Sequence, residues 1–506
     1  MLNRYVKKIL KANIYDLVEK VPLEKAENLS ARLNNTIVLK REDMQPVFSF
    51  KLRGAYNKIL QLSDSQKKRG IIAASAGNHA QGVALSAKRL GINALIVMPK
   101  TTPEIKVTAV QHYGAEVRLH GNNYDEACQY AKELIETSGR VFIHPYDDPD
   151  VIAGQGTIAM EIMQQCTSPP DAIFVPVGGG GLIAGIATYI KYLYPSIKVI
   201  GVEPDDAACL YEALKARNRV VLKHVGIFAD GVAVKQVGEE PYKIAEKYVD
   251  DVICVSSDEI CAAIKDIFDD TRTVTEPAGA LAVAGLKKYI VNTKLQNKKF
   301  VAINSGANMN FDRLRHVTER AEIGERREML FVSEIDEQAG SFQQFCHLIG
   351  LRGITEFNYR YSDPKKAQVF VGVKMQNADE DREQILQMLE QHGYSTVDLT
   401  DNELAKVHIR YMVGGKAPGA ENERIFRFQF PERPGALLRF LDKMGQKKWN
   451  ISLFHYRNHG SAFGRVLAGI QVPEKDNEKF DAYLKDLAYH YWEETDNPAY
   501  KKFLGS

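Results

Sequence analysis

The chain has 506 residues, with 66 lysines and arginines against 64 aspartates and glutamates, so its formal net charge is +2. This length exceeds one compact core and predicts roughly three or four structural units. The near balance of charge argues against nucleic acid or an anionic membrane as a partner, because neither would be attracted by a strong net field. A small molecule is the expected partner.

The cysteines and the N-terminus indicate the compartment. The six cysteines form neither CxxC pairs nor a regular framework, which argues against a disulfide scaffold and a zinc knuckle. Residues 1–10 mix charge into apolar positions and lack the apolar core of a signal peptide. No stretch approaches the ~18 apolar residues of a membrane span. We therefore expect a cytoplasmic protein with no membrane association.

Apolar runs rich in β-formers alternate with helical patterns from about residue 35 to residue 310, which is typical of βαβ units and a mostly parallel sheet. The predicted strands are 71–74, 94–98, 116–119, 141–143, 172–177, 199–202 and 300–303. Parallel sheets of this kind bind ligands beyond the carboxyl ends of their strands. Three polar loops fall at such ends, at 75–79, 178–181 and 304–308.

One lysine stands in an apolar setting. Lys51 lies between Phe50 and Leu52 and is followed by Arg53. A lysine reacts with an aldehyde only when its amine can lose its proton, which requires a poorly hydrated site or a cationic neighbour. The apolar residues provide the first condition, and Arg53 is a candidate for the second. The alternative is a solvated surface lysine.

A run of four glycines, 178–181, follows a predicted strand and precedes a helix that is predicted to begin near Leu182. Glycines let the backbone approach an anion closely, and N–H groups at a helix start add a favourable dipole. We interpret the run as a phosphate site. The alternative is a flexible turn. No Lys-Ser or Lys-Thr follows, so the run is not a Walker loop, and it matches a dinucleotide fingerprint poorly.

Two further loops carry candidate ligand groups. The loop Ser75-Ala76-Gly77-Asn78 lies between a predicted strand and a helix, so its N–H groups can bind a carboxylate and the Asn78 amide can bond a phenolic oxygen. Ser305 follows the last predicted strand and can bond a ring nitrogen. An ordinary helix cap and an ordinary turn explain these residue types equally well.

The charged segment 315–327 marks a boundary and is either a solvated helix or a flexible linker. The tail beyond it contains an internal repeat. Glu337-Gln-Ala-Gly340 recurs as Glu432-Arg-Pro-Gly435, Phe357-Asn-Tyr359-Arg360 recurs as Phe454-His-Tyr456-Arg457, and 369–373 recurs as 466–470. Each copy is predicted to run strand, turn, helix, strand, strand, helix, which is a ferredoxin-like order. With its Glu-x-x-Gly turn, the unit resembles the amino-acid-sensing ACT module.

Taken in order, the motifs at 49–55, 75–82, 153–157, 176–182 and 305–308 resemble those of the tryptophan-synthase-β-like (fold type II) pyridoxal phosphate enzymes. The resemblance covers essentially the whole chain. The motif Arg41-Glu-Asp43, with Gln45-Pro46 and the two ACT-like copies, narrows it to biosynthetic threonine deaminase (threonine ammonia-lyase). It implies an α/β catalytic domain of two doubly wound subdomains at 1–320, followed by ferredoxin-like α+β regulatory subdomains at 329–400 and 423–495.

The resemblance also implies roles for the site residues. Lys51 would hold pyridoxal 5'-phosphate through its amine and move the α-proton of the substrate, and Phe50 would pack against the ring. Ser305 would bond the pyridine nitrogen, and Asn78 the ring hydroxyl oxygen. The substrate carboxylate would be bound by Ser75, Ala76, Gly77 and Asn78. The cofactor phosphate would be bound by Gly178, Gly179, Gly180, Gly181 and Leu182.

The implied reaction removes the β-hydroxyl of L-threonine and yields 2-oxobutanoate and ammonia, the first committed step of isoleucine biosynthesis. A serine at the pyridine nitrogen cannot protonate it as an aspartate would, which favours elimination over transamination. L-serine is expected to be a poorer substrate, because one methyl group lost in an apolar pocket costs about 1–3 kcal/mol.

Two positions separate the chain from the related serine racemases. Racemases carry a second serine as proton donor on the opposite face, where this chain has Ala76. They also often bind a divalent metal through carboxylates that follow a Glu-Pro pair. Here Glu203-Pro204 is followed by Cys209 at the place of the last acidic ligand. We therefore predict neither racemisation nor this metal site.

The tail implies feedback inhibition by isoleucine, counter-regulation by valine and, from the family, a homotetramer. Tyr359, Arg360, Tyr456 and Arg457 are candidate effector contacts, and the alternative is that they pack between the copies. Rival interpretations are a serine-preferring catabolic deaminase or a threonine synthase, and an amino-acid-binding protein on an inactive enzyme scaffold. Catabolic deaminases lack the double tail, and threonine synthase acts on a phosphorylated substrate and has different local motifs. The intact lysine and glycine motifs argue against the inactive scaffold.

Overall fold

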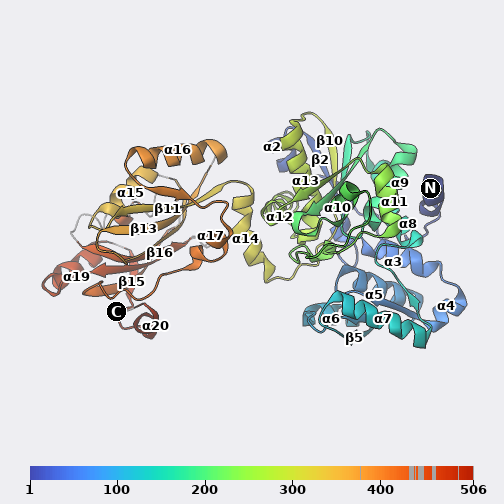
Figure 1. The fold of residues 1–506 in the computed structure, drawn as a ribbon, viewed down its shortest axis with the longest axis horizontal. Helices are drawn as coiled ribbons and strands as arrows, with labels where there is room; N and C mark the ends of the chain where they lie inside the picture. The colour runs from blue at the N-terminus through green and yellow to red at the C-terminus, as the bar shows by residue number, and fades with distance from the viewer. Residues whose placement is uncertain are drawn as a thin grey trace. The chain divides into compact units, whose positions relative to one another are not determined.

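The chain folds into two compact units, Met1–Gly324 and Glu325–Ser506 (Figure 1). The computed structural model describes residues 1–350, 352–375, 378–431, 438, 440–442, 449–457, 463–487 and 489–504. The charged segment at 315–327 lies largely in a helix, α14 (Arg313–Gly324), which is the last element of the first unit. None of the described helices is long and apolar enough to cross a membrane.

The first unit contains two sheets. The larger has the order β1-β2-β10-β7-β8-β9, and its strands are parallel except for β1. Its strands are β1 (Leu23–Lys25), β2 (Thr36–Arg41), β7 (Ala172–Pro176), β8 (Lys198–Pro204), β9 (Asp251–Val255) and β10 (Lys299–Asn304). The smaller sheet is parallel and has the order β5-β4-β3-β6. Its strands are β3 (Ile71–Ala74), β4 (Ala94–Met98), β5 (Glu116–Leu119) and β6 (Val141–Phe142).

Helices cover both faces of the larger sheet. Ile173 and Val175 of β7 pack in a core with residues of α8 and α9, whereas Phe174 packs in a second core with residues of α12 and α13. A strand covered on both faces must be apolar throughout, which is why β7 and β4 read as continuous hydrophobic runs. The helices of this unit, besides α14, are α1 (Leu2–Leu10), α2 (Glu27–Arg32), α3 (Lys51–Leu60), α4 (Asp64–Arg69), α5 (Asn78–Leu90), α6 (Glu104–His112), α7 (Tyr124–Ser138), α8 (Pro149–Gln165), α9 (Gly181–Leu193), α10 (Cys209–Ala216), α11 (Glu239–Tyr248), α12 (Ser257–Thr271) and α13 (Pro277–Thr293).

The second unit is built on one antiparallel sheet of the order β14-β11-β13-β12-β16-β17-β15-β18. Its first copy contains β11 (Glu328–Asp336), α15 (Ser341–Ile349), β12 (Ile354–Arg360), β13 (Lys366–Lys374), α16 (Ala378–Gln391) and β14 (Thr396–Asp398). The second contains β15 (Glu423–Pro431), β16 (Asn450–Arg457), β17 (Phe463–Gln471), α19 (Asn477–Asp486) and β18 (His490–Glu493). Short helices α17 (Glu403–Val407) and α20 (Pro498–Phe503) follow the two copies.

The two copies join edge to edge. Strands β12 and β16 pair antiparallel, so that Tyr359 lies opposite Phe454 and Phe357 opposite Tyr456. Each copy also ends in a short fourth strand, β14 or β18, that the sequence did not predict. The second Glu-x-x-Gly motif, Glu432–Gly435, lies outside the described residues.

Candidate active site

The predicted cofactor contacts meet in one pocket of the first unit. Lys51 and Phe50 at the start of α3, Asn78 at the start of α5 and Ser305 after β10 line this pocket, together with Gly178, Gly179, Gly180, Gly181 and Leu182. Asn78, the glycine run and Ser305 follow the carboxyl ends of β3, β7 and β10, where parallel sheets bind ligands. Gln155 of the 153–157 motif also lines the pocket, as do Tyr146, Val232 and Glu276, which the sequence did not single out.

The glycine run leaves no room for side chains. A Cβ atom at Gly179 would lie 2.2 Å from the Tyr146 ring, and one at Gly178 would lie 2.9 Å from the Cα of Val232. Gly180 has φ +89°, which only glycine adopts readily, and is the N-cap of α9. The first N–H groups of a helix lack partners within the helix. A backbone that can be approached closely beside such a helix start suits a phosphate group.

Lys51 is the first residue of α3. Its backbone N–H donates to the Ser49 Oγ at 3.2 Å, and its Nζ lies 5.2 Å from the centroid of the Phe50 ring. Burial lowers the pKa of the Lys51 amine to about 8, against the opposing attraction of Glu276. The expectation that Arg53 is the cationic neighbour is wrong, since its guanidinium pairs with Glu42 and Glu161 and the lowered pKa comes from burial. An amine that loses its proton near pH 8 suits covalent chemistry with an aldehyde.

Asn78 belongs to a chain of polar contacts. Its Nδ2 donates to Glu276 Oε1 at 2.6 Å, and its Oδ1 accepts from Asn308 Nδ2 at 2.7 Å. Burial, and then the charge of Asp230, raises the pKa of Glu276 to about 7, against the hydrogen bond from Asn78 and the charges of Lys106 and Lys51. Sequence reasoning missed Glu276 because an acidic residue before a proline, here Pro277 at the start of α13, resembles an ordinary helix start.

Ser305 and the 75–77 loop differ in their relation to the pocket. Ser305 is buried in the pocket wall, and its Oγ donates to the Ala278 carbonyl oxygen at 3.3 Å. Ser75, Ala76 and Gly77 are half-buried and lie directly before Asn78, but they are outside the set that lines the pocket. A Cβ atom at Gly77 would meet open space, so this helix start is accessible.

The four candidate effector residues lie on the two paired strands β12 and β16. The Tyr359 hydroxyl donates to Glu337, and Tyr456 is buried. The Arg360 guanidinium donates to the carboxylate of Glu423 and to three carbonyl oxygens, those of Gly415, Ser452 and Leu504. The side chain of Arg457 lies outside the described part of the chain. Tyr359, Arg360 and Tyr456 thus pack between the two copies, as the alternative interpretation has it. Effector binding by these residues stays a prediction.

The Glu203 region has ordinary helix-start chemistry. The Glu203 carboxylate accepts the N–H groups of Leu210 and Tyr211, each at 2.8 Å, and the Cys209 thiol donates to the Gly178 carbonyl oxygen at 3.3 Å. Among the described residues, no group of three or more His, Cys, Asp or Glu side chains is arranged to hold a metal.

Comparison with known proteins adds to this geometry. Residues 14–306 match the family described as pyridoxal-phosphate dependent enzymes. Residues 319–409 and 414–504 each match the C-terminal regulatory domain of threonine dehydratase. The chain belongs to the biosynthetic threonine dehydratase family. These matches confirm the predicted fold class, the pyridoxal phosphate cofactor class and the duplicated regulatory tail.

Relatives in this family match the chain along nearly its whole length. It is 54% identical over 500 residues to the biosynthetic L-threonine dehydratase IlvA of Pasteurella multocida (strain Pm70), covering 99% of this chain and 97% of that protein. The IlvA protein of Escherichia coli (strain K12) gives the same values. Among solved structures, the processed form of threonine deaminase isoform 2 from Solanum lycopersicum is 50% identical, with a TM-score of 0.62 over 63% of this chain and 93% of that chain.

Proposed function

We propose that the protein converts L-threonine into 2-oxobutanoate and ammonia with pyridoxal 5'-phosphate held at Lys51. The observation that carries the proposal is the convergence of Lys51, the glycine run and Ser305 on one pocket. The chain also matches threonine dehydratases over 99% of its length. The pocket fits the cofactor, because its glycine run accepts a phosphate, its lysine can react with an aldehyde and its serine can face a ring nitrogen.

The bound cofactor supplies an electron-accepting ring that makes the substrate α-proton removable. Lys51 is the group placed to take that proton, because its amine is buried in the pocket and its pKa is lowered to about 8. A base with a pKa near the working pH combines a useful neutral fraction with sufficient basicity. Phe50 and Leu182 border the pocket as apolar walls that keep water from the reacting atoms.

Two neighbouring groups set the direction of the reaction. The Ser305 hydroxyl does not carry a charge, so it can bond a ring nitrogen without giving it a full proton, which supports elimination over transamination. At the start of α5 the Ser75 N–H already donates to the Val97 carbonyl oxygen and the Gly77 N–H to the Ser75 Oγ, so the N–H groups of Ala76 and Asn78 are the ones placed to bind a carboxylate. We infer that this loop binds the substrate carboxylate, although its first three residues lie outside the pocket lining.

The second unit supports allosteric control of this activity. The two regulatory copies share one sheet and meet at a seam, the pairing of β12 with β16. A change at this seam would reach both copies. We infer that isoleucine inhibits through this unit and that valine opposes it, with Tyr359, Arg360, Tyr456 and Arg457 near the effectors. We also infer a cytoplasmic homotetramer and a lower activity on L-serine. An effector acts only if its affinity differs between two states of the protein.

The test measures 2-oxobutanoate from L-threonine and pyruvate from L-serine, with and without isoleucine, for the wild type and Lys51→Ala. We expect faster turnover of threonine, suppression by isoleucine and loss of activity in the variant. A protein that binds pyridoxal phosphate but ignores threonine would refute the substrate assignment. A wild type that acquires no cofactor absorbance after added pyridoxal phosphate would favour the non-enzymatic rival.

A further inference from the structure

Arg53 lies two residues after Lys51 and is completely buried. Its guanidinium binds two carboxylates bidentately, with Nε and Nη2 at 2.7 and 2.8 Å from Glu42 oxygens and Nη1 and Nη2 at 2.6 and 3.0 Å from Glu161 oxygens. Nη1 also donates to Thr157 Oγ1 at 3.1 Å, and Nη2 to the Glu19 carbonyl oxygen at 3.3 Å. All five guanidinium N–H groups therefore have acceptors.

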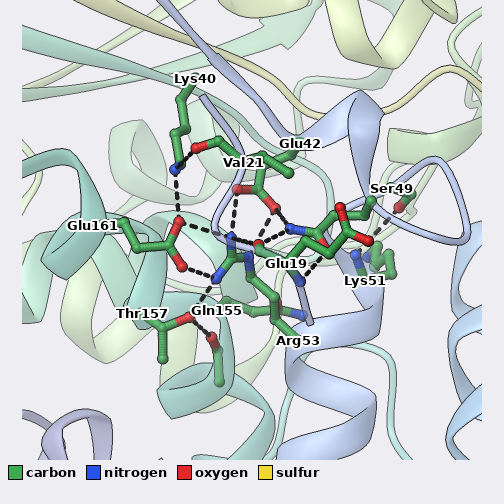
Figure 2. A network of polar contacts seen from close by, with 12 residues as sticks. Glu19, Val21, Lys40, Glu42, Ser49, Lys51, Arg53, Gln155, Thr157 and Glu161 are labelled. Carbon is green, nitrogen blue, oxygen red and sulfur yellow. Dashed lines mark hydrogen bonds and ion pairs between the residues drawn. The ribbon is translucent and has the colours of Figure 1, made fainter. Parts of the chain in front are cut away.

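This network balances its own charge. Lys40 is also fully buried, and its Nζ lies 2.6 Å from Glu161 Oε2 and 2.7 Å from the Val21 carbonyl oxygen. Two cations thus face two carboxylates, which lowers the cost of burying each charge. Burial alone would raise the pKa of Glu161, but Arg53 and Lys40 hold it below its ordinary value. Figure 2 shows the Arg53 guanidinium between Glu42 and Glu161, with Lys40 beyond Glu161.

The network fixes the start of α3 against two other elements. Glu42 stands directly after β2, and Glu161 lies on α8, whose start is set by the Asp148 carboxylate and by Pro149. The backbones of α3 and α8 also touch, since a Cβ atom at Gly154 would lie 2.5 Å from the Arg53 carbonyl oxygen. The Gly54 N–H donates to Gln155 Oε1 at 3.1 Å. The first turn of α3 therefore has little freedom to shift.

Lys51 and Arg53 leave this turn in different directions. Residues two apart on a helix point to nearly opposite sides, so Lys51 lines the pocket while Arg53 enters the buried network (Figure 2). We propose that Arg53, through Glu42 and Glu161, is a positioning residue that fixes the Lys51 amine relative to the glycine run and Ser305. This inference rests on the proposed function of Lys51 and adds the residue that holds it in place.

A lysine at position 53 separates positioning from charge. Arg53→Lys keeps the positive charge, but an ammonium cannot bind both carboxylates bidentately. The first turn of α3 should loosen while the unit stays folded. A misplaced catalytic group slows the chemical step without weakening substrate binding equally.

The experiment compares holoenzymes of the wild type, Arg53→Lys and a matched control, Arg410→Lys. Arg410 is a buried arginine of the second unit that also pairs with two glutamates, Glu328 and Glu356. Three quantities are measured without effectors: kcat and KM for L-threonine, and the pH midpoint of the absorbance band of the lysine-bound cofactor. For Arg53→Lys we expect kcat to fall by about 10- to 100-fold, KM to stay nearly unchanged and the midpoint to shift. For Arg410→Lys we expect wild-type values of all three quantities.

Equal kcat and equal band midpoints in the wild type and Arg53→Lys would overturn the inference, and so would equal changes in the control. If Arg53→Lys does not fold, Glu161→Gln takes its place, because it keeps the Arg53–Glu42 pair. For Glu161→Gln we then expect kcat and the band midpoint to change in the same direction by a smaller amount. If neither changes, the inference is overturned. A wild type that shows neither the band nor the product refutes the proposed function itself, which separates the two failures.

Discussion

In the first unit, Lys51, Asn78 and Ser305 line a pocket, whereas in the second unit Tyr359, Arg360 and Tyr456 lie on two strands that pair across the repeat. Parallel strands end together and leave a crevice that loops surround. Two antiparallel edge strands that pair close the edge between them. Polar residues in an apolar context therefore mark an open site in one unit and a closed seam in the other.

The distribution of glycines in the sequence already separates the pocket of the first unit from the seam of the second. In the first unit the polar residues accompany loops and a glycine run, which keep side chains out of the space. In the second unit they stand inside strand patterns and bond to groups of other strands of the same sheet, as Arg360 of β12 does with Glu423 of β15. The comparison predicts that filling the pocket harms ligand binding, while emptying the seam harms stability.

Arg360→Ala should give the largest effect, a loss of stability in the second unit, because it removes a buried side chain from the seam. Arg360 and Glu423 are nearly buried, with 8% and 3% of their side chains exposed. Removing one partner of a buried ion pair costs about 3–5 kcal/mol. Hydrogen exchange of the β12 and β16 amides measures the loss. The control is Arg427→Ala on β15 of the same sheet, whose pair with Glu494 is more exposed and is worth at most about 1 kcal/mol. Equal protection in the two variants would contradict the buried seam.

Gly179→Ala should fill the pocket. The new Cβ atom would lie 2.2 Å from the Tyr146 ring, so the loop or the ring must move. Overpacking of this kind costs about 1–3 kcal/mol, which corresponds to a loss of about 5- to 150-fold in cofactor affinity. Titration with pyridoxal phosphate, followed by absorbance, measures this affinity. In the control Gly415→Ala the Cβ atom meets open space, and wild-type affinity is expected. A Gly179→Ala protein with wild-type affinity would argue against a phosphate cradle.

Glu276→Gln tests the charge in the pocket through pH. The pKa of Glu276 is raised to about 7, so its protonated form stabilises the folded first unit at low pH, and this contribution is lost as the pH rises through 7. Between pH 5 and 8 the stability of the cofactor-free wild type should fall relative to the variant by on the order of 2 kcal/mol. Urea denaturation of the wild type and of Glu276→Gln at pH 5 and pH 8 measures this difference in the free energy of unfolding. Titration of the Lys51 amine, whose pKa is about 8, changes the stability mainly above pH 8 and so adds little to this difference. Parallel pH curves would contradict the raised pKa.

Tyr359→Phe should give the smallest effect. The substitution removes the hydroxyl that donates to Glu337 but leaves Asn450 Nδ2, which donates to the same carboxylate at 2.9 Å. The loss of one hydrogen bond costs about 1 kcal/mol. Thermal unfolding of the second unit measures it. If isoleucine inhibition disappears while the stability is unchanged, Tyr359 acts as an effector contact and not as part of the seam.

Much of the first unit could be predicted because its strands are continuous apolar runs; β3, β4 and β5 have the predicted bounds. Strand β2 was missed because it ends in Lys40 and Arg41, which are buried only through their partners Glu161 and Asp43. The Lys40–Glu161 pair joins residues far apart in sequence and leaves no local pattern. Glu276 was missed because its place before Pro277 resembles an ordinary helix start, and only the folded chain brings it to Asn78.

Lys51 is the lysine that we propose to bind the cofactor covalently. Borohydride reduction of the pyridoxal-phosphate-loaded protein, followed by digestion and mass spectrometry, identifies the modified lysine. We predict one dominant adduct, on the peptide that contains Lys51, and none in Lys51→Ala. An adduct mainly on another lysine, or the same yield of pocket-bound adduct in Lys51→Ala, would contradict the assignment of Lys51.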